Sequence, residues 1–247
     1  MRVDVGPAEL SGAALPPPES FAPFAAFELE RWFAANALRA RCDLAGSGAA
    51  PITLREILAL ASPDEREAFE GASLGYRPGD GSRALRTAVA ARYDGVDADS
   101  VLVTCGAIEA LHLAVAALVR AGDDVVVQDP MYPAVAGLAR ARGARVVPWP
   151  LRAERGYHHS LEDLHRVLSP RTRLVAITQP NGPTGSVLDA AELDALCALL
   201  AARGIWLLSD EVYRDLALKP GLRVPTVARR SARAVAVGDL GKPFAAL

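Results

Sequence analysis

The stretch RTRLVAITQPNGPTGSVLDAAELDALCALLAARGIWLLSD, residues 171–210, decides the fold. It contains two short apolar runs, Leu174–Ile177 and Ile205–Leu208. Runs this short and this continuously apolar are typical of strands buried on both faces of a sheet. Between them, residues 189–203 have helical apolar spacing, and Gly204 stands where a C-terminal helix glycine is expected. The order strand, loop, helix, strand predicts two parallel strands joined by a crossover helix.

The same alternation extends over most of the chain. Asp189 and Glu192 have capping-box spacing and mark the start of the helix in that stretch. The expected strands are 101–103, 125–127, 145–147, 174–177, 205–208 and 234–237, and the expected helices are 84–93, 108–120, 133–142, 160–168 and 189–203. This rhythm predicts an α/β fold with a mainly parallel sheet and helices on both faces.

The N-terminal part has a different organisation. Residues 1–25 carry Pro16-Pro17-Pro18 and are expected to form an extended arm. Helical patterns follow at 27–38 and 52–61, and the Gly- and Pro-rich stretch 71–81 predicts a structured loop. We therefore divide the chain into an N-terminal arm with a helical segment, 1–70, and a large domain, 71–247.

Composition excludes several classes of protein. Hydrophobic residues make up 51% of the chain and aromatic residues 6%, which favours helices on a parallel sheet over an all-β design. The net charge is −2 with no basic tract, so neither nucleic acid nor a membrane is expected as a partner. The three cysteines are widely spaced, so we expect neither disulfides nor a metal site. The sequence has no secretory pattern and no apolar run near ~20 residues, which predicts a cytoplasmic protein.

Ligands of parallel sheets bind at the carboxyl ends of the strands, and several motifs fall at such ends. Gly106, in Thr104–Glu109, allows a tight turn at the start of a helix, where backbone N–H groups could bind a phosphate. An ordinary strand-to-helix turn has the same sequence pattern. Tyr132, in Gln128–Pro133, could lay its ring against a planar heterocycle or simply cover the sheet edge.

Two further motifs follow later strands. The loop Thr178–Gly185 contains two prolines and two glycines, so its amides and Asn181 could face a ligand. Asp210 follows a buried strand, and a buried carboxylate needs a partner such as a protonated pyridine nitrogen; its alternative role is a helix cap. Tyr213 stands three residues later, within reach of an oxygen on the same ring.

Lys242 completes the series. It lies in the turn Gly238–Phe244 after the apolar run Ala234–Val237, although a turn lysine alone is usually a surface residue. A phosphate turn, a ring-covering tyrosine, an Asn/Pro loop, an Asp-x-x-Tyr motif and a strand-end lysine in this order together predict a pyridoxal 5′-phosphate pocket with Lys242 as the Schiff-base amine.

From Gly75 onward the chain resembles the class I/II aminotransferases, a fold-type I family of pyridoxal phosphate enzymes. The resemblance implies the fold-type I large domain and an amino acid substrate. It implies that Gly106, Ala107 and Ile108 hold the phosphate, Tyr132 stacks on the ring, Asp210 pairs with the ring nitrogen, Asn181 and Tyr213 approach the ring oxygen, and Lys242 carries the cofactor. Tyr76 matches a tyrosine that reaches the neighbouring subunit's phosphate, which implies a homodimer.

The chain departs from the family pattern at three positions. Where the family loop reads N-P-x-N-P-T-G, Gly182 replaces the asparagine that touches the ring oxygen. Gly241 and Asp239 replace serines just before the lysine, so a phosphate-binding hydroxyl is missing. A weaker resemblance, to capreomycidine synthase-like members, implies a lyase or cyclase acting on a hydroxylated arginine as the alternative function.

In family members a phosphate-binding arginine follows shortly after the lysine, and the chain continues into a small domain that carries the arginine for the substrate α-carboxylate. Because the sequence ends at Leu247, we expect the small domain to be missing. We therefore also expect this chain to bind the cofactor weakly and to have little transaminase activity. A catalytically inactive fragment is therefore the second alternative. A nicotinamide-binding protein is disfavoured, because no glycine fingerprint follows the first strand.

Overall fold

The computed structural model describes residues 27–36, 39, 41–42, 45–216, 221 and 223–245. The expected N-terminal arm, residues 1–25, lies outside the described residues. In the described part of the chain no helix is both long enough and apolar enough to cross a membrane.

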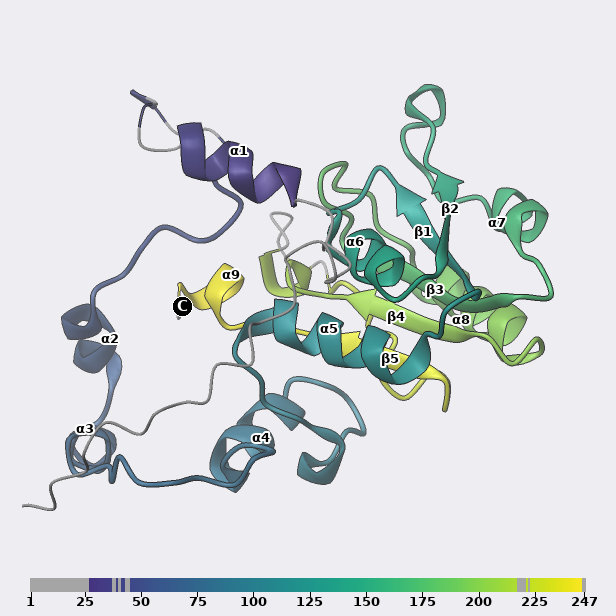
Figure 1. The fold of residues 1–247 in the computed structure, drawn as a ribbon. Coiled ribbons are helices and arrows are strands. Elements are labelled where there is room, and N and C mark those ends of the chain that lie inside the picture. Colours follow the sequence, from purple (N-terminus) through teal and green to yellow (C-terminus); the bar gives the residue numbers. More distant parts are fainter. Residues whose placement is uncertain are drawn as a thin grey trace, which may run out of the picture.

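Five parallel strands form one sheet in the order β2-β1-β3-β4-β5 (Figure 1). Their bounds are Asp124–Asp129 (β1), Arg145–Pro150 (β2), Thr172–Thr178 (β3), Trp206–Asp210 (β4) and Ala234–Val237 (β5). The register places Val126 beside Val147 of β2 and Val175 of β3, so β-branched side chains stack in rows across the sheet. The chain runs from β1 out to β2 and returns to β3 on the other side of β1, which creates a topological switch point between β1 and β3.

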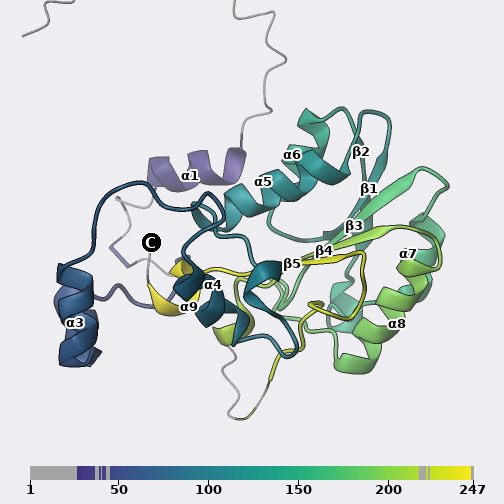
Figure 2. The same ribbon diagram turned by 90° about the horizontal axis from the view of Figure 1, so that it is seen from below.

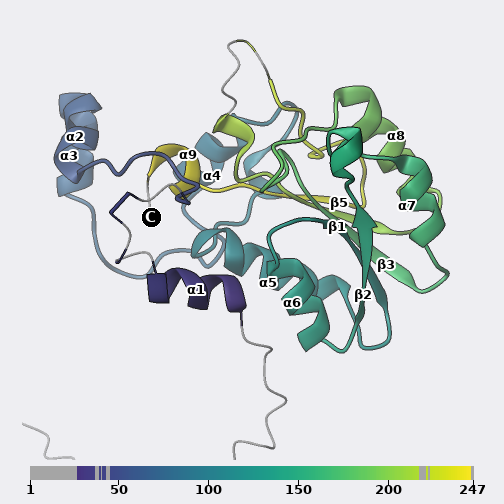
Figure 3. The same cartoon turned by 90° about the horizontal axis from the view of Figure 1, so that it is seen from above.

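Helices cover both faces of the sheet, as Figures 2 and 3 show. One face carries α5 (Gly106–Leu118) and α6 (Ala134–Ala141), and the other carries α7 (Leu161–Val167) and α8 (Ala190–Ala201). Val125 and Val127 belong to the core under α5 and α6, whereas Val126 belongs to the core under α7 and α8. This alternation follows from the two-residue period of a strand. The predicted parallel sheet with helices on both faces is confirmed.

Four helices precede α5 in the described residues. They are α1 (Glu28–Asn36), α2 (Leu54–Leu60), α3 (Pro63–Glu70) and α4 (Arg83–Ala90). Figures 1 and 3 show α2 and α3 away from the sheet. The predicted helices at 27–38, 52–61 and 84–93 correspond to α1, α2 and α4. The sequence interpretation missed α3, although Ser62 and Glu65 form a capping box and Pro63 occupies the first helical position.

The strand predicted at 101–103 is wrong. These residues join no strand, and the N–H of Val103 donates to the carbonyl of Asp80 at 3.1 Å. Leu102 is 57% exposed, so the run has neither the burial nor the partner that makes a short apolar run a strand. The remaining short elements are 3₁₀ turns at Ala98–Ser100, Ala153–Arg155 and Arg214–Leu216 and the final turn α9, Gly241–Phe244.

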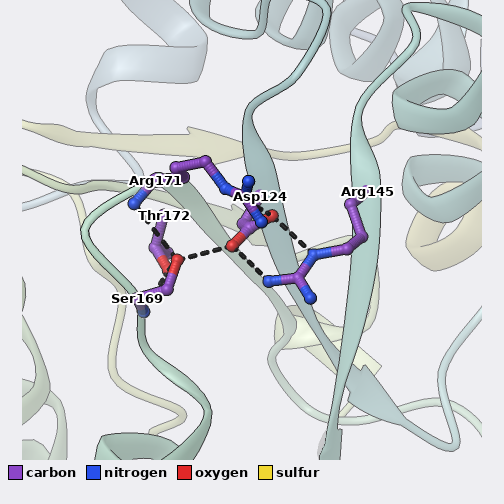
Figure 4. Close-up of polar contacts among 5 residues, drawn as sticks. All are labelled: Asp124, Arg145, Ser169, Arg171 and Thr172. Carbon is purple, nitrogen blue, oxygen red and sulfur yellow. Dashed lines mark hydrogen bonds and ion pairs between the residues drawn. The ribbon is translucent and has the colours of Figure 1, made fainter.

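An ion pair between the buried Asp124 and the exposed Arg145 joins the amino ends of β1 and β2, close to the start of β3 (Figure 4). The guanidinium of Arg145 donates to both carboxylate oxygens of Asp124, at 2.7 and 2.6 Å, and the Ser169 hydroxyl donates to the same carboxylate. These hydrogen bonds, that of Arg145 foremost, hold the pKa of the buried Asp124 carboxyl at about 2 despite its burial. The pair stabilises the edge of the sheet opposite the one at which the predicted motifs gather.

Candidate functional site

The predicted motifs gather at the carboxyl edge of the sheet. Gln128–Pro133 leaves β1, Gln179–Gly185 leaves β3, Asp210 ends β4, and Gly238–Lys242 leaves β5. Helices α1 and α9 lie beyond the same edge (Figures 1 and 3). This edge includes the switch point between β1 and β3, the place where open parallel sheets bind their ligands.

Asp210 forms the floor of the site. It is only 5% exposed, and among the described residues its carboxylate has one recorded hydrogen bond, from the Val212 N–H at 3.3 Å. Burial raises the pKa of Asp210 to about 6; nearby Asp239 and Glu211 add to the rise and Lys242 opposes it. Asp210 is therefore a buried carboxylate with little compensation from the protein, within electrostatic reach of Lys242.

Lys242 is held by groups on both sides. The Asp239 carboxylate accepts the N–H groups of Gly241 and Lys242, both at 2.9 Å, and so fixes the turn after β5. At the other end, the ammonium donates to the Ser47 hydroxyl at 2.8 Å and lies 5.9 Å from the centre of the Tyr213 ring. The N–H of Ala49 also donates to the Lys242 carbonyl at 2.8 Å, so the segment around Ser47 runs along the lysine.

Sequence reasoning missed Ser47 as a site residue. The hydroxyl is 195 residues from the lysine that it contacts, so no local pattern could pair them. The one available signal is its place between Gly46 and Gly48, because small neighbours let the backbone approach another chain segment closely.

Tyr132 lies within electrostatic reach of Tyr213 and Asp210. The Tyr132 hydroxyl donates to a carboxylate oxygen of Glu30 at 2.7 Å, and the Phe27 ring meets the Tyr132 ring edge-on with centroids 5.3 Å apart. Burial, followed by Glu30, raises the pKa of Tyr132. A Cβ added at Gly182 would lie 3.0 Å from the Tyr213 ring, so the glycine lets the two loops close together. Glu30 was also missed by sequence reasoning, since it lies 102 residues from Tyr132.

Asn181 is turned into the protein. It is 2% exposed, and its amide nitrogen donates to the Gln128 side-chain oxygen at 2.9 Å and to the Pro130 carbonyl at 3.2 Å. Its amide oxygen accepts the N–H and the hydroxyl of Thr184, at 3.2 and 2.8 Å. Asn181 thus joins the loops after β1 and β3.

The helix start at Gly106 offers backbone donors. Gly106 has φ +77°, a conformation that favours glycine, and the preceding Cys105 provides no side-chain cap in the described structure. The Glu109 carboxylate accepts the Cys105 N–H, whereas no described side chain caps the N–H groups of Ala107 and Ile108. Tyr76, on the 71–81 loop, has a fully exposed side chain and is not among the residues gathered around Asp210.

The site fits pyridoxal 5′-phosphate on the ring side. A buried, poorly compensated carboxylate suits a protonated pyridine nitrogen, and a half-buried lysine amine near it suits an aldehyde. On the phosphate side, the start of α5 supplies a helix dipole and free N–H groups, while Asp239 already takes the N–H groups at α9. Among the described residues, no cluster of three or more His, Cys, Asp or Glu side chains could hold a metal ion.

The protein-family model for class I and II aminotransferases matches residues 53–247. Among curated proteins, the chain is 41% identical over 141 residues to the arginine–pyruvate transaminase of Pseudomonas aeruginosa, a match covering 55% of this chain and 36% of that protein. It is 39% identical over 190 residues to the capreomycidine synthase of Streptomyces vinaceus, covering 76% of this chain and 49% of that protein.

Solved structures give the same picture. A PLP-dependent aminotransferase from Streptococcus suis superposes with a TM-score of 0.81 at 32% identity, over 89% of this chain and 59% of that one. The N-succinyldiaminopimelate aminotransferase of Mycobacterium tuberculosis superposes with a TM-score of 0.73 at 30% identity, over 93% of this chain and 60% of that one. The chain therefore spans about 60% of these two solved chains and less than half of the two curated relatives.

Proposed function

Because the chain belongs to the class I and II aminotransferase family, we propose that residues 71–247 form a pyridoxal phosphate-binding domain of an enzyme that transfers the amino group of an amino acid. The observation that carries this proposal is Asp210, a buried carboxylate with one recorded hydrogen bond, beside Lys242. When bound, pyridoxal phosphate supplies an aldehyde that reacts with amines and a ring that accepts electrons from the substrate Cα.

Each residue then has a defined task. Asp210 would hold a proton on the ring nitrogen, and the Tyr213 hydroxyl would donate to the ring oxygen. Lys242 Nζ would hold the cofactor, and its amine would serve as the base for the proton on the substrate Cα. Tyr132 would pack against the ring.

The remaining members of the proposed site hold the cofactor in place. At the positive end of α5, the backbone N–H groups of Ala107 and Ile108 would bind the phosphate. Gly106 would provide the turn that brings them there, because its own N–H donates to the Thr104 carbonyl at 2.9 Å. Asn181 fixes the loops around the ring through its bonds to Gln128 and Pro130. Ser47 orients the lysine amine through its 2.8 Å hydrogen bond.

The experiment uses the fact that Lys219 and Lys242 are the lysines of the sequence. Pyridoxal phosphate is added to the purified chain, the absorbance of the protein-bound cofactor is recorded, and the adduct is fixed with borohydride and mapped by mass spectrometry. We expect the adduct on Lys242, no band in Lys242→Ala, and an unchanged band in the control Lys219→Ala. An adduct on Lys219 or the α-amine alone, or no band at all, would refute the proposal and support the inactive alternative.

A second function is favoured by one observation. The match to capreomycidine synthase covers 76% of this chain, compared with 55% for the arginine–pyruvate transaminase. A lyase or cyclase acting on a hydroxylated arginine is therefore the alternative. Incubation with arginine or a hydroxylated arginine, together with pyruvate, separates the two. Alanine production indicates amino transfer, and loss of water from the hydroxylated arginine without alanine indicates the alternative.

The proposal includes a homodimer and a cytoplasmic location. Support for the dimer is the fully exposed Tyr76 on the 71–81 loop, which could reach the phosphate of a second copy. If so, mixing Tyr76→Ala with Lys242→Ala chains restores cofactor binding in the mixed dimer, and light scattering gives twice the monomer mass. Cys42, Cys105 and Cys197 are free thiols, which supports a reducing compartment that cell fractionation can test.

A further inference from the structure

A polar network lies beneath the site on the α7/α8 face of the sheet. Its centre is Gln128, which is 1% exposed near the end of β1. The Gln128 side-chain oxygen accepts the backbone N–H of Thr178 at 2.7 Å and the Asn181 amide at 2.9 Å. Its amide nitrogen lies 2.5 Å from Nε2 of His159, in the connection between β2 and α7.

The backbone fixes the direction of every hydrogen bond in this network. The Thr178 N–H can only donate, so the oxygen of the Gln128 amide must face it, and the nitrogen must face His159. Asn181 is oriented in the same way, because the Pro130 carbonyl can only accept. An amide nitrogen only donates, so Nε2 of His159 must be the acceptor, which places the imidazole proton on Nδ1.

The surroundings of His159 agree with a neutral ring. Its ring packs edge-on against the buried Trp149 with centroids 5.5 Å apart, and the Trp149 indole donates to the Ser160 carbonyl at 3.0 Å. Burial, with a smaller contribution from His158, lowers the pKa of His159 to about 4. His158 is the titratable neighbour that contributes to this lowering. The imidazole is therefore held in one tautomer and one orientation.

The network ends at two walls of the site. Asn181 bonds the Pro130 carbonyl, two residues before Tyr132, and precedes Gly182, which packs against the Tyr213 ring. We propose that His159 is a positioning residue of the cofactor site, acting through Gln128 and Asn181 on the loops that carry Tyr132 and contact Tyr213, and only as the neutral Nδ1–H tautomer. The statement that these loops hold a cofactor rests on the proposed function. The coupling between His159 and the two loops does not depend on it.

Protonation of His159 Nε2, or its removal, would break the hydrogen bond between His159 and Gln128. A proton on Nε2 would point at the Gln128 amide, so two donors would face each other and the amide would have to turn. Gln128 would then present its nitrogen to the Thr178 N–H and to Asn181, which leaves buried donors unpaired. The loop after β3 would lose its fixed relation to the loop after β1.

The test begins with the unmodified protein without cofactor. The ¹⁵N and ¹H spectra of ¹⁵N-histidine-labelled chain report the tautomer of each of the four histidines. We expect one histidine to stay neutral, with a proton on Nδ1 and a bare Nε2, from pH 8 to pH 5. The resonance is assigned by its loss in His159→Gln. A His159 that carries its proton on Nε2, or becomes charged near pH 6.5, would overturn the proposal.

Variants then test the coupling to the site. His159→Leu removes the acceptor, His159→Gln keeps one, and His158→Leu is the matched control beside it. We expect His159→Leu to shift the Asn181 side-chain amide resonances and to weaken pyridoxal phosphate binding about fivefold, while His159→Gln restores both. Equal effects of the two His159 variants, or an unmoved Asn181 amide, would contradict the proposal. If no chain binds the cofactor, the proposed function fails, and the tautomer and the Asn181 resonances still decide this inference.

Discussion

Replacing Asp210 with asparagine should stabilise the cofactor-free protein while damaging its function. Burial raises the pKa of Asp210 from 3.8 to about 6, so the folded protein holds this proton more tightly than the unfolded chain does. The ionised carboxylate therefore destabilises the fold, and the cost grows as the pH rises from about 4 to about 6. At pH 7 the difference between the two pKa values corresponds to about 3 kcal/mol.

The variant should recover most of this free energy. Asparagine can still accept the Val212 N–H but cannot ionise, so we expect a gain in unfolding free energy of roughly 1–3 kcal/mol at pH 7. At pH 4.5 about two thirds of the gain should disappear, because Asp210 is then mostly protonated in the folded parent. Urea unfolding followed by far-UV circular dichroism, at both pH values and without cofactor, measures the difference.

The sign of the effect separates the two roles of a buried aspartate. If the carboxylate serves the fold, as a helix cap does, its substitution lowers the stability of the protein. If it serves a cationic ligand, its substitution raises the stability of the ligand-free protein and weakens pyridoxal phosphate binding. If Asp210→Asn is less stable than the parent at pH 7, or if the gain does not shrink at pH 4.5, the assignment of Asp210 as an uncompensated ligand-binding carboxylate is wrong.

Three further predictions follow from other parts of the structure. Asp124→Asn should do the opposite of Asp210→Asn and lower the unfolding free energy at pH 7 by roughly 1–2 kcal/mol; the estimate is discounted because Arg145 is largely solvent-exposed. The difference in unfolding free energy between variant and parent should shrink as the pH falls from about 4 towards 2, because Asp124 becomes protonated in the folded parent. A urea midpoint that is the same in variant and parent at pH 7 would contradict this prediction. Ser47→Ala should slow the capture of pyridoxal phosphate by Lys242 about three- to tenfold without altering the urea midpoint, measured by stopped-flow absorbance, whereas equal rates would remove Ser47 from the site. Asp239→Ser removes a negative charge at the phosphate side and should tighten pyridoxal phosphate binding about three- to tenfold in an equilibrium titration; weaker binding would show that the turn at α9 depends on the carboxylate.

Much of the fold could be predicted from local pattern. The apolar runs of β1, β3 and β4 are continuous because these strands are covered on both faces, and the capping box of α8 marks its start. The exception at 101–103 has the same composition as a strand but no neighbour to pair with. Propensity describes what a segment can become, whereas strand pairing depends on what stands beside it.

The sequence by itself determined which chemical groups follow each strand, and hence that a carboxylate, two tyrosines and a lysine share one edge of the sheet. Tertiary structure alone decided what each group touches: Ser47 meets Lys242 and Glu30 meets Tyr132 across 195 and 102 residues of chain. It also turned the Asn181 amide inward to Gln128 and so linked His159 to the site. Hydrophobic period and helix caps are local and can be read along the chain, whereas the partner of a polar side chain is set by the packing of distant segments, where each buried donor must find an acceptor.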